Sequence, residues 1–189
     1  MESALIVSCT DKSAAFFSEA LNAASIKQIN VLNSAGIARR YLLDQDFDLV
    51  IVDAPLTDES GEDFSRNIAS KSLSQVMLAV NSEHFNAVAA VCEQDGVLII
   101  SKPVNRDVFW SALSLAKSAS SRIKRIQAEN AKLKQKIEDI RLIDRAKLLL
   151  ISYLKLSEQE AHRFIEKQAM ELRSSKRTIA EGILKTYAS

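Results

Sequence analysis

The sequence predicts an α/β domain built on a doubly wound, five-stranded parallel sheet, followed by a long coiled-coil helix and an all-α domain of three helices. Three observations lead to this fold class. Short runs rich in valine and isoleucine alternate with longer amphipathic stretches over residues 1–116. A helical pattern beginning at Asp107 then continues without glycine or proline, and two later interruptions divide the C-terminal part into helices. The expected domain boundaries are 1–116, 117–141 and 142–189.

Five apolar runs are the expected strands, at residues 4–8, 27–31, 48–53, 75–80 and 96–100. Runs that are apolar throughout are typical of parallel strands covered on both faces, which right-handed helical crossovers connect. In such sheets the functional side chains gather at the carboxyl ends of the strands. Here those ends carry Ser8 and Cys9, Asp53, Asn81 and Ser82, and Ser101 and Lys102.

The long helix carries a heptad pattern that predicts a parallel, homodimeric coiled coil. Its seam positions are Ile123, Ile126, Asn130, Leu133, Ile137 and Ile140. Asn130 would be a buried asparagine at position a, which pairs with its own copy in the second chain and disfavours other registers. The alternative interpretation is that Asn130 is a lone polar residue on an amphipathic helix. The strict heptad would next bring Asp144 and Lys147 into the seam, so we expect the coiled coil to end near Arg141.

The C-terminal part is interrupted at residues 153–157 and 173–176, which predicts three helices. Ser157 and Glu160 match the S-x-x-E capping box and mark the start of the middle helix. A three-helix unit of this size would be marginally stable alone, so fusion to a dimeric coiled coil should stabilise it. We expect its core to contain Leu149, Leu150, Tyr153, Ala161, Phe164, Ile165, Leu172 and Ile183.

Charge is distributed unevenly along the chain. Up to Ala116 there are 8 lysines and arginines against 15 aspartates and glutamates, and after it 17 against 9. An acidic part is therefore joined to a basic one. The basic part suits a polyanion such as nucleic acid, although basic helices also serve as plain solvated surface.

Several functional classes find no support in the sequence. There is no signal peptide and no apolar run long enough to span a bilayer, so we expect a cytoplasmic protein without a membrane partner. Cys9 and Cys92 lack metal-site spacing and are expected to be buried, reduced thiols. Neither His84 nor His162 belongs to a recognisable triad or metal motif, and no phosphate-binding loop occurs. We therefore expect neither an enzyme nor a metal site.

The strings DLVIVDAPLTDESG at 48–61 and SKP at 101–103 resemble the third and fifth strands of response-regulator receiver domains, which have a flavodoxin-like fold. The resemblance implies that Asp53 is the phosphoryl acceptor and that Lys102 neutralises the acyl phosphate. Receivers also carry paired acids after the first strand to hold Mg²⁺, whereas Ser8 and Cys9 stand there and Asp11 is displaced. A hydroxyl and a thiol are poor Mg²⁺ ligands, so we expect severely weakened Mg²⁺ binding and no resident cofactor.

The hydroxyl residue that receivers place on the fourth strand has no clear counterpart, because Ala79, Val80 or Asn81 occupies the matching place. Two interpretations stay open. In a degenerate receiver, Asp53 and Lys102 form a structural ion pair, and a partner protein controls the domain or nothing does. In a functional receiver, phosphorylation of Asp53 rearranges the dimer. We favour the degenerate receiver.

The stretch 142–184 is similar to the ANTAR domain, the three-helix RNA-binding module of antiterminator response regulators. The resemblance rests on IDRAK at 143–147, LSE at 156–158, EAH at 160–162, QAM at 168–170 and Ile179–Ala180. Two departures are the leucines at 148–150, where the family continues with Gly and a Leu-Met pair, and His162, where an aromatic residue is usual. The resemblance implies binding to paired stem-loops in leader mRNA, which keeps the terminator hairpin from forming.

Basic residues expected outside the helical core are the candidate RNA contacts: Arg145, Lys147, His162, Arg163, Lys167, Arg173, Lys176 and Arg177. His162 and Tyr187 are candidate stacking platforms for bases. The expected partners are leader mRNA stem-loops, a second copy of the chain, and a sensor kinase or a sequestering regulator protein. The alternatives are a DNA-binding response regulator and a non-enzymatic dimeric signalling scaffold.

Overall fold

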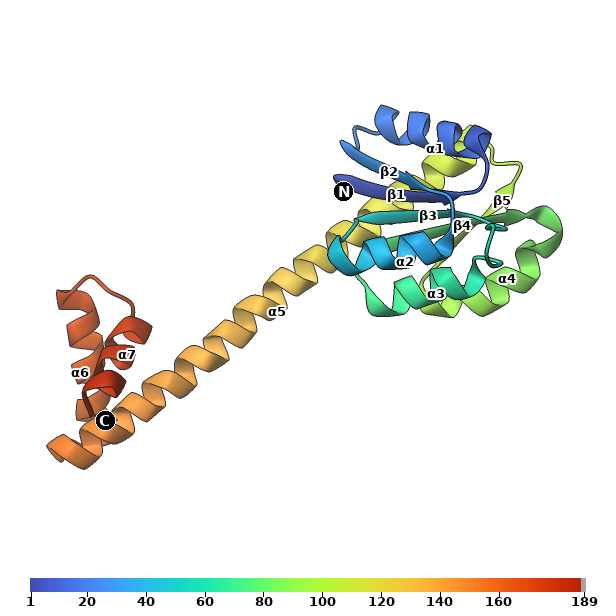
Figure 1. Ribbon diagram of the computed structural model, residues 1–189. Helices are drawn as coiled ribbons and strands as arrows, with labels where there is room; N and C mark the ends of the chain where they lie inside the picture. Colours follow the sequence, from blue (N-terminus) through green and yellow to red (C-terminus); the bar gives the residue numbers. More distant parts are fainter. Residues whose placement is uncertain (188–189) are drawn as a thin grey trace. The chain divides into compact units, whose positions relative to one another are not determined.

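The computed structural model describes residues 1–187, which form two compact units, one from Met1 to Arg125 and one that begins at Ile126 (Figure 1). The first unit extends beyond the boundary at residue 116 expected from the sequence. The reason is that Ser120 is still buried and the Lys124 ammonium lies 2.6 Å from the Asp48 carboxylate. The expected coiled-coil segment is thereby divided between the two units.

The first unit contains a five-stranded, entirely parallel sheet with strand order β2-β1-β3-β4-β5, which confirms the predicted fold class. The strands are β1 (Ser3–Ser8), β2 (Gln28–Leu32), β3 (Leu49–Asp53), β4 (Gln75–Asn81) and β5 (Leu98–Lys102). The connecting helices are α1 (Asp11–Ala23), α2 (Ala35–Asp44), α3 (Glu62–Lys71) and α4 (Phe85–Cys92), with 3₁₀ turns η1 (Ser82–His84) and η2 (Glu93–Asp95).

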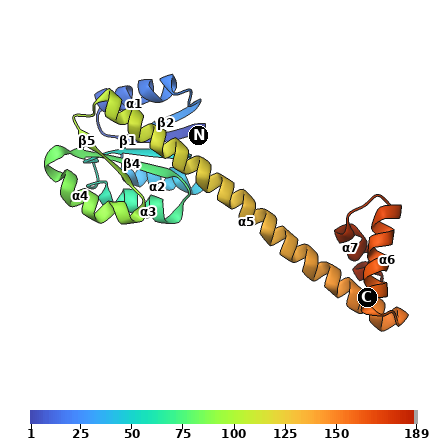
Figure 2. The same ribbon diagram turned by 180° about the vertical axis from the view of Figure 1, so that it is seen from behind.

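Helices cover the sheet on both faces, α1 and the start of α5 (Arg106–Leu154) on one and α2, α3 and α4 on the other (Figures 1 and 2). Alternate residues of a strand therefore enter different cores. Leu5 and Val7 of β1 pack toward α2 and α3, whereas Ala4 and Ile6 pack toward Phe109 of α5. Burial on both faces explains why the strands are apolar at every position and not only at alternate ones.

α5 is one uninterrupted helix of 49 residues that contributes to both units. Its first turns bury Phe109, Leu113, Ala116 and Ser120, which recur every three or four residues and face the sheet. Farther along, the apolar side chains expected in the seam are exposed: Ile126, Leu133, Ile137 and Ile140. Ile123 differs from them, because it is half-buried within its own chain.

The second unit packs the end of α5 against α6 (Glu158–Glu171) and α7 (Lys176–Tyr187), as the sequence predicts. Its buried residues are Ala146, Leu150, Ala161, Ile165, Ala180 and Ile183. Three residues expected in this core are instead exposed, Tyr153 by 60%, Phe164 by 39% and Leu172 by 64%. Ala161, Ile165 and Ala169 form the inward stripe of α6, so Phe164 is turned about 100° away and Leu172 stands beyond the last turn.

The predicted capping box is present at the start of α6. The Glu160 backbone N–H donates to Ser157 Oγ at 3.3 Å, and Glu160 Oε2 accepts from the Ser157 backbone N–H at 2.8 Å. This backbone hydrogen bond, with help from the Ser157 hydroxyl, lowers the pKa of Glu160 below its ordinary value. A carboxyl with a lowered pKa stabilises the fold above its ordinary pKa, and the contribution is lost as pH falls through the lowered value.

We expect Ser157→Ala to destabilise the second unit by about 1 kcal/mol at neutral pH, because it removes the cap. The difference from the unaltered protein should begin to shrink as pH falls below the ordinary pKa of Glu160, about 4.5, and should shrink further as pH falls through the lowered pKa, where Glu160 becomes protonated in the folded protein. Thermal unfolding followed by circular dichroism measures both effects. Ser152→Ala, on an exposed position of α5, is the matched control. A difference that stays constant down to strongly acidic pH would contradict the role given to Glu160.

Candidate phosphoacceptor site and nucleic-acid interface

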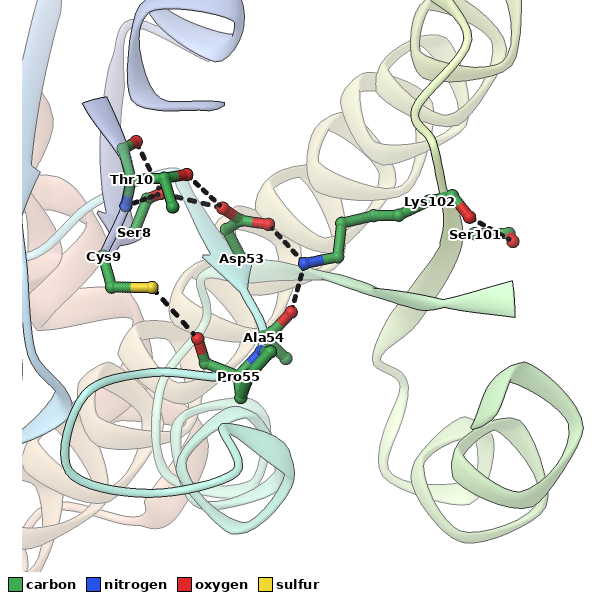
Figure 3. A network of polar contacts seen from close by, with 8 residues as sticks. All are labelled: Ser8, Cys9, Thr10, Asp53, Ala54, Pro55, Ser101 and Lys102. Carbon is green, nitrogen blue, oxygen red and sulfur yellow. Dashed lines mark hydrogen bonds and ion pairs between the residues drawn. The ribbon is translucent and has the colours of Figure 1, made fainter. Parts of the chain in front are cut away.

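Asp53 ends β3 at the carboxyl edge of the sheet, where β1 and β5 bring the other polar residues predicted from the sequence (Figure 3). Its side chain is only 3% exposed. The Ser8 hydroxyl donates to Asp53 Oδ2 at 2.8 Å, and the Thr10 hydroxyl donates to the same oxygen at 3.4 Å. Lys102 Nζ lies 3.0 Å from Oδ1 and also donates to the Ala54 carbonyl. Both oxygens of this buried carboxylate therefore have partners within the chain.

Strand register accounts for this arrangement. Ser8 lies directly opposite Asp53 in the β1–β3 pair, and Lys102 lies opposite Asn81 at the end of the β4–β5 pair. The strand order changes direction around β1 and β3, which is where α/β sheets place their sites. Thr10 was not among the residues predicted from the sequence, although its position two residues beyond a strand end is a usable signal.

The donor set around Asp53 does not fit a magnesium site of the receiver kind. Mg²⁺ requires an octahedral shell of oxygen ligands, usually with one or two carboxylates besides water. Ser8 offers a hydroxyl that already bonds Asp53, and Cys9 offers a thiol that donates to the Pro55 carbonyl at 3.3 Å. Cys9 is exposed and not buried as expected from the sequence, because it lies just beyond the end of β1. Within residues 1–187 there is no group of three histidine, cysteine or acidic side chains arranged to hold a metal.

The position on β4 where receivers carry a hydroxyl residue is apolar in this chain. Ala79 pairs with Asp53 in the β3–β4 register, and its carbonyl accepts from the Ala54 N–H at 2.9 Å. Ala79 and Val80 are both buried, and the next hydroxyl, of Ser82, belongs to η1 beyond the strand. Next to Asp53, β4 therefore presents a methyl group and no hydroxyl.

The candidate RNA contacts of the second unit fall into two groups. The first is engaged with carboxylates: Lys147 with Asp144 and Glu158, His162 with Glu166, Lys167 with Glu171, Lys176 with Glu166, and Arg177 with Asp139 and Glu181. Arg177 also lowers the pKa of Asp139, acting together with the larger effect of the Gln135 side chain. Three of these pairs, Lys147–Glu158, Lys176–Glu166 and Arg177–Asp139, connect the helices to one another, and the others lie within one helix.

Lys147 departs most from the sequence-based expectation, which placed it largely outside the core. Its side chain is only 15% exposed, with Nζ 2.8 Å from Asp144 and 3.2 Å from Glu158. Hydrogen bonds to Asp144 and Glu158, in that order, raise the pKa of Lys147. The expectation of an exposed Lys147 is wrong, because the start of α6 covers this face of α5.

The second group consists of exposed cations whose side chains make no ion pair within residues 126–187. It contains three predicted residues, Arg145, Arg163 and Arg173. Arg141 and Lys155 share the property, but sequence reasoning missed them because Arg141 marks the expected end of the coiled coil and Lys155 lies in the expected interruption at residues 153–157. These five side chains, together with the exposed Lys132, Lys134 and Lys136 earlier on α5, can bind an anion without first breaking an ion pair.

Comparison with known proteins finds similar proteins for both units. Residues 131–184 match the sequence profile of the ANTAR domain. The transcriptional regulatory protein PdtaR of Mycobacterium tuberculosis is 28% identical over 142 residues, which cover 75% of this chain and 69% of that protein.

Solved receiver domains resemble the first unit. The receiver domain of a putative LuxO repressor protein from Vibrio parahaemolyticus superposes with a TM-score of 0.59 at 20% identity, over 66% of this chain and 96% of that one. The receiver domain of an HD-domain protein from Pseudomonas fluorescens gives 0.56 at 18% identity, over 65% and 91%.

The first unit thus has the receiver fold. Residues 131–184 match the ANTAR domain, so the chain combines a receiver-like fold with an ANTAR domain that follows it. The profile match begins at residue 131, within the segment expected to be coiled coil, so that segment is continuous with the ANTAR domain. None of the described helices has the length and apolar character needed to cross a membrane.

Proposed function

We propose that the protein is a transcription antitermination regulator that binds paired stem-loops in leader RNA as a homodimer. The observation that carries this proposal is the ANTAR match over residues 131–184. The excess of cations after Ala116 supports a polyanionic partner. No covalent chemistry is required, since binding alone would keep the terminator hairpin from forming.

The RNA contacts that we favour are the exposed, unpaired arginines of the ANTAR domain, Arg145, Arg163 and Arg173. A guanidinium without a carboxylate partner can bind phosphate, or stack on a base, at no cost in broken ion pairs. Phe164 is 39% exposed next to Arg163, and it is a candidate stacking surface beside a phosphate contact. Tyr187, predicted as a platform, packs against Tyr153 at a ring-centroid distance of 5.3 Å.

We expect Arg163→Ala and Arg173→Ala each to weaken binding to a paired-hairpin leader RNA several-fold. Each should also reduce the slope of log affinity against log salt concentration by about the amount that one phosphate contact contributes. Gel-shift or fluorescence-anisotropy titrations at two salt concentrations measure both quantities. Lys71→Ala removes an equal charge from the receiver-like domain and is the control. Unchanged affinity in both arginine variants would remove them from the interface. Equal binding to a DNA duplex would favour a DNA-binding regulator, and binding to neither would favour a protein scaffold.

Dimerisation through α5 is the second part of the proposal. At about 100° per residue, Ile126, Asn130, Leu133, Ile137 and Ile140 fall within an arc of roughly 80° on the helix. Ala146 and Leu150, which pack against α6 and α7, point roughly 140° away from that arc. The apolar stripe is exposed by 46–59% at Ile126, Leu133, Ile137 and Ile140. A second α5 can therefore cover it without displacing α6 or α7, and two linked RNA-binding modules increase avidity for paired hairpins.

The receiver-like domain is proposed to act without Mg²⁺-dependent phosphorylation. The hydroxyls of Ser8 and Thr10 bond Asp53 from the side where receivers keep their metal-binding acids, and Lys102 occupies the other oxygen. Control would then come from a partner protein, either a sensor kinase acting by contact or a sequestering regulator.

A further inference from the structure

A row of exposed cations follows one flank of α5 within the second unit. Its members are Lys134, Arg141 and Arg145, and none of them forms an ion pair within residues 126–187. At about 100° per residue, the three positions fall within an arc of about 40° on the helix. They therefore form a line parallel to the helix axis, about 16 Å long at a rise of about 1.5 Å per residue. We call this line the basic flank of α5.

The basic flank lies between two faces of α5 that have other contacts. The exposed apolar stripe with Leu133 and Ile137 is centred about 80° to one side of it. Ala146, which packs against α6 and α7, lies about 100° to the other side of Arg145. The helical core therefore does not cover the basic flank. A second copy on the apolar stripe would also leave these long side chains able to reach water.

The opposite flank of α5 is not open in the same way. It begins with the exposed Lys132 and Lys136 and continues to Lys147. The Lys147 ammonium is bound by Asp144 and Glu158, and its side chain is only 15% exposed because the start of α6 covers it. Only the basic flank thus continues as free cations onto the part of α5 that belongs to the helical core.

One acidic residue, Glu138, borders the basic flank. It is exposed, four residues after Lys134 and three before Arg141, and among the described residues it pairs with neither of them. It also lies about 120° from the centre of the apolar stripe, so it has no part in the proposed dimer contact. Glu138 therefore reduces the positive potential of the flank without neutralising any one cation.

A straight line of cations suits the regular phosphates of a paired RNA stem. Double-stranded RNA is recognised mainly by its shape and through phosphate and 2′-hydroxyl contacts, whereas unpaired bases are bound by stacking on aromatic or guanidinium planes. Between residues 126 and 152 the sequence of α5 contains no aromatic residue. The basic flank thus has the charges for a stem backbone but lacks aromatic surfaces for unpaired bases.

From this arrangement we infer that the basic flank of α5 binds the phosphate backbone of the hairpin stem, so that the three-helix bundle is left to bind the unpaired loop. Arg145 joins the two surfaces, because it lies on the flank and next to Ala146 of the helical core. The inference rests on the proposed RNA binding and extends the contact surface onto the segment that was expected to serve dimerisation alone.

Binding of the full chain to two leader RNAs provides the test. Both RNAs carry the same paired hairpin loops, but one keeps its full stems and the other is trimmed to the base pairs next to the loops. Fluorescence anisotropy at several salt concentrations compares Lys134→Ala, Arg141→Ala and Glu138→Gln with the unaltered protein. Lys132→Ala is the matched control, because it removes one charge from an exposed position of the same helix about 160° away from Lys134. Analytical ultracentrifugation gives the mass of each variant.

We expect Lys134→Ala and Arg141→Ala each to weaken binding of the full-stem RNA roughly fivefold and to lower its salt slope by about the contribution of one phosphate contact. Neither change should alter binding of the trimmed RNA or the mass of the protein. Glu138→Gln should strengthen binding of the full-stem RNA about twofold, because it removes a negative charge that repels the phosphates. Lys132→Ala should leave both affinities unchanged.

Three results would overturn the stem contact while leaving RNA binding in place. The first is an equal loss in Lys132→Ala, and the second is a loss that the trimmed RNA shows to the same extent. The third is a loss that accompanies a lower mass while Glu138→Gln has no effect. Failure of the unaltered protein to bind either RNA would instead overturn the proposed function itself.

Discussion

Replacement of Ile165 by alanine is expected to lower the free energy of unfolding of the ANTAR domain by about 3 kcal/mol, the usual cost of truncating a fully buried isoleucine. Ile165 is 1% exposed at the centre of α6. The buried core of this domain contains only three large side chains, Leu150, Ile165 and Ile183, besides three alanines. So small a core gives limited stability, and the loss should leave the domain largely unfolded near physiological temperature while the receiver-like domain stays folded.

Leu172→Ala is the matched control for this prediction, because it removes the same number of carbon atoms from the residue that directly follows α6. Leu172 is 64% exposed, and its truncation should change the stability by no more than about 0.5 kcal/mol. Thermal and urea unfolding of the full chain, followed by circular dichroism, should show the lower-melting transition altered only in Ile165→Ala. Similar losses in the two variants would mean that Leu172 belongs to the core after all.

The contrast between these two residues shows what an amino-acid pattern can and cannot predict. The strands of the receiver-like domain were predictable, since parallel strands covered on both faces are apolar throughout, as LVIVD of β3 is. The helices of the ANTAR domain were also predictable in number and order. Their inward faces were predicted less well, because alanines at positions 161, 169 and 180 make close helix contacts that leave the larger Phe164 and Leu172 outside.

The same limit applies to the functional residues. Asp53 and Lys102 could be placed together from the sequence, because the carboxyl ends of parallel strands share one edge of the sheet. Thr10 follows β1 by two residues, which places it near the same edge, but its contact with Asp53 depends on the path of the chain after β1. Lys147 was expected outside the helical core because it belongs to the polar face of its predicted helix. In the structure, however, Glu158 at the start of α6 pairs with it across the turn that connects α5 and α6. Hydrophobic periodicity predicts which face of a helix is buried, but it does not predict which residue of another helix contacts a given side chain.

Lys102→Met is expected to destabilise the receiver-like domain by about 2 kcal/mol, because it leaves the buried Asp53 carboxylate without its cation. The figure is below the usual cost of breaking a fully buried pair, since the Lys102 side chain is 23% exposed and the Ser8 and Thr10 hydroxyls remain bonded to Asp53. Adding Asp53→Asn to Lys102→Met should restore most of the loss, because neither residue then carries a buried charge. Urea unfolding of the two single variants and the double variant measures the coupling between the residues.

The double variant also separates a structural ion pair from a phosphorylation site. If Asp53 and Lys102 serve only to hold β3 and β5 together, the Asp53→Asn, Lys102→Met protein should fold, dimerise and bind leader RNA as the unaltered chain does, with or without acetyl phosphate and Mg²⁺. If Asp53 accepts a phosphoryl group, acetyl phosphate should change RNA binding or dimerisation of the unaltered protein, and the double variant should not respond. The hydroxyls at the carboxylate favour the first result, because a phosphoryl group could reach Asp53 Oδ2 only after Ser8 and Thr10 had moved away.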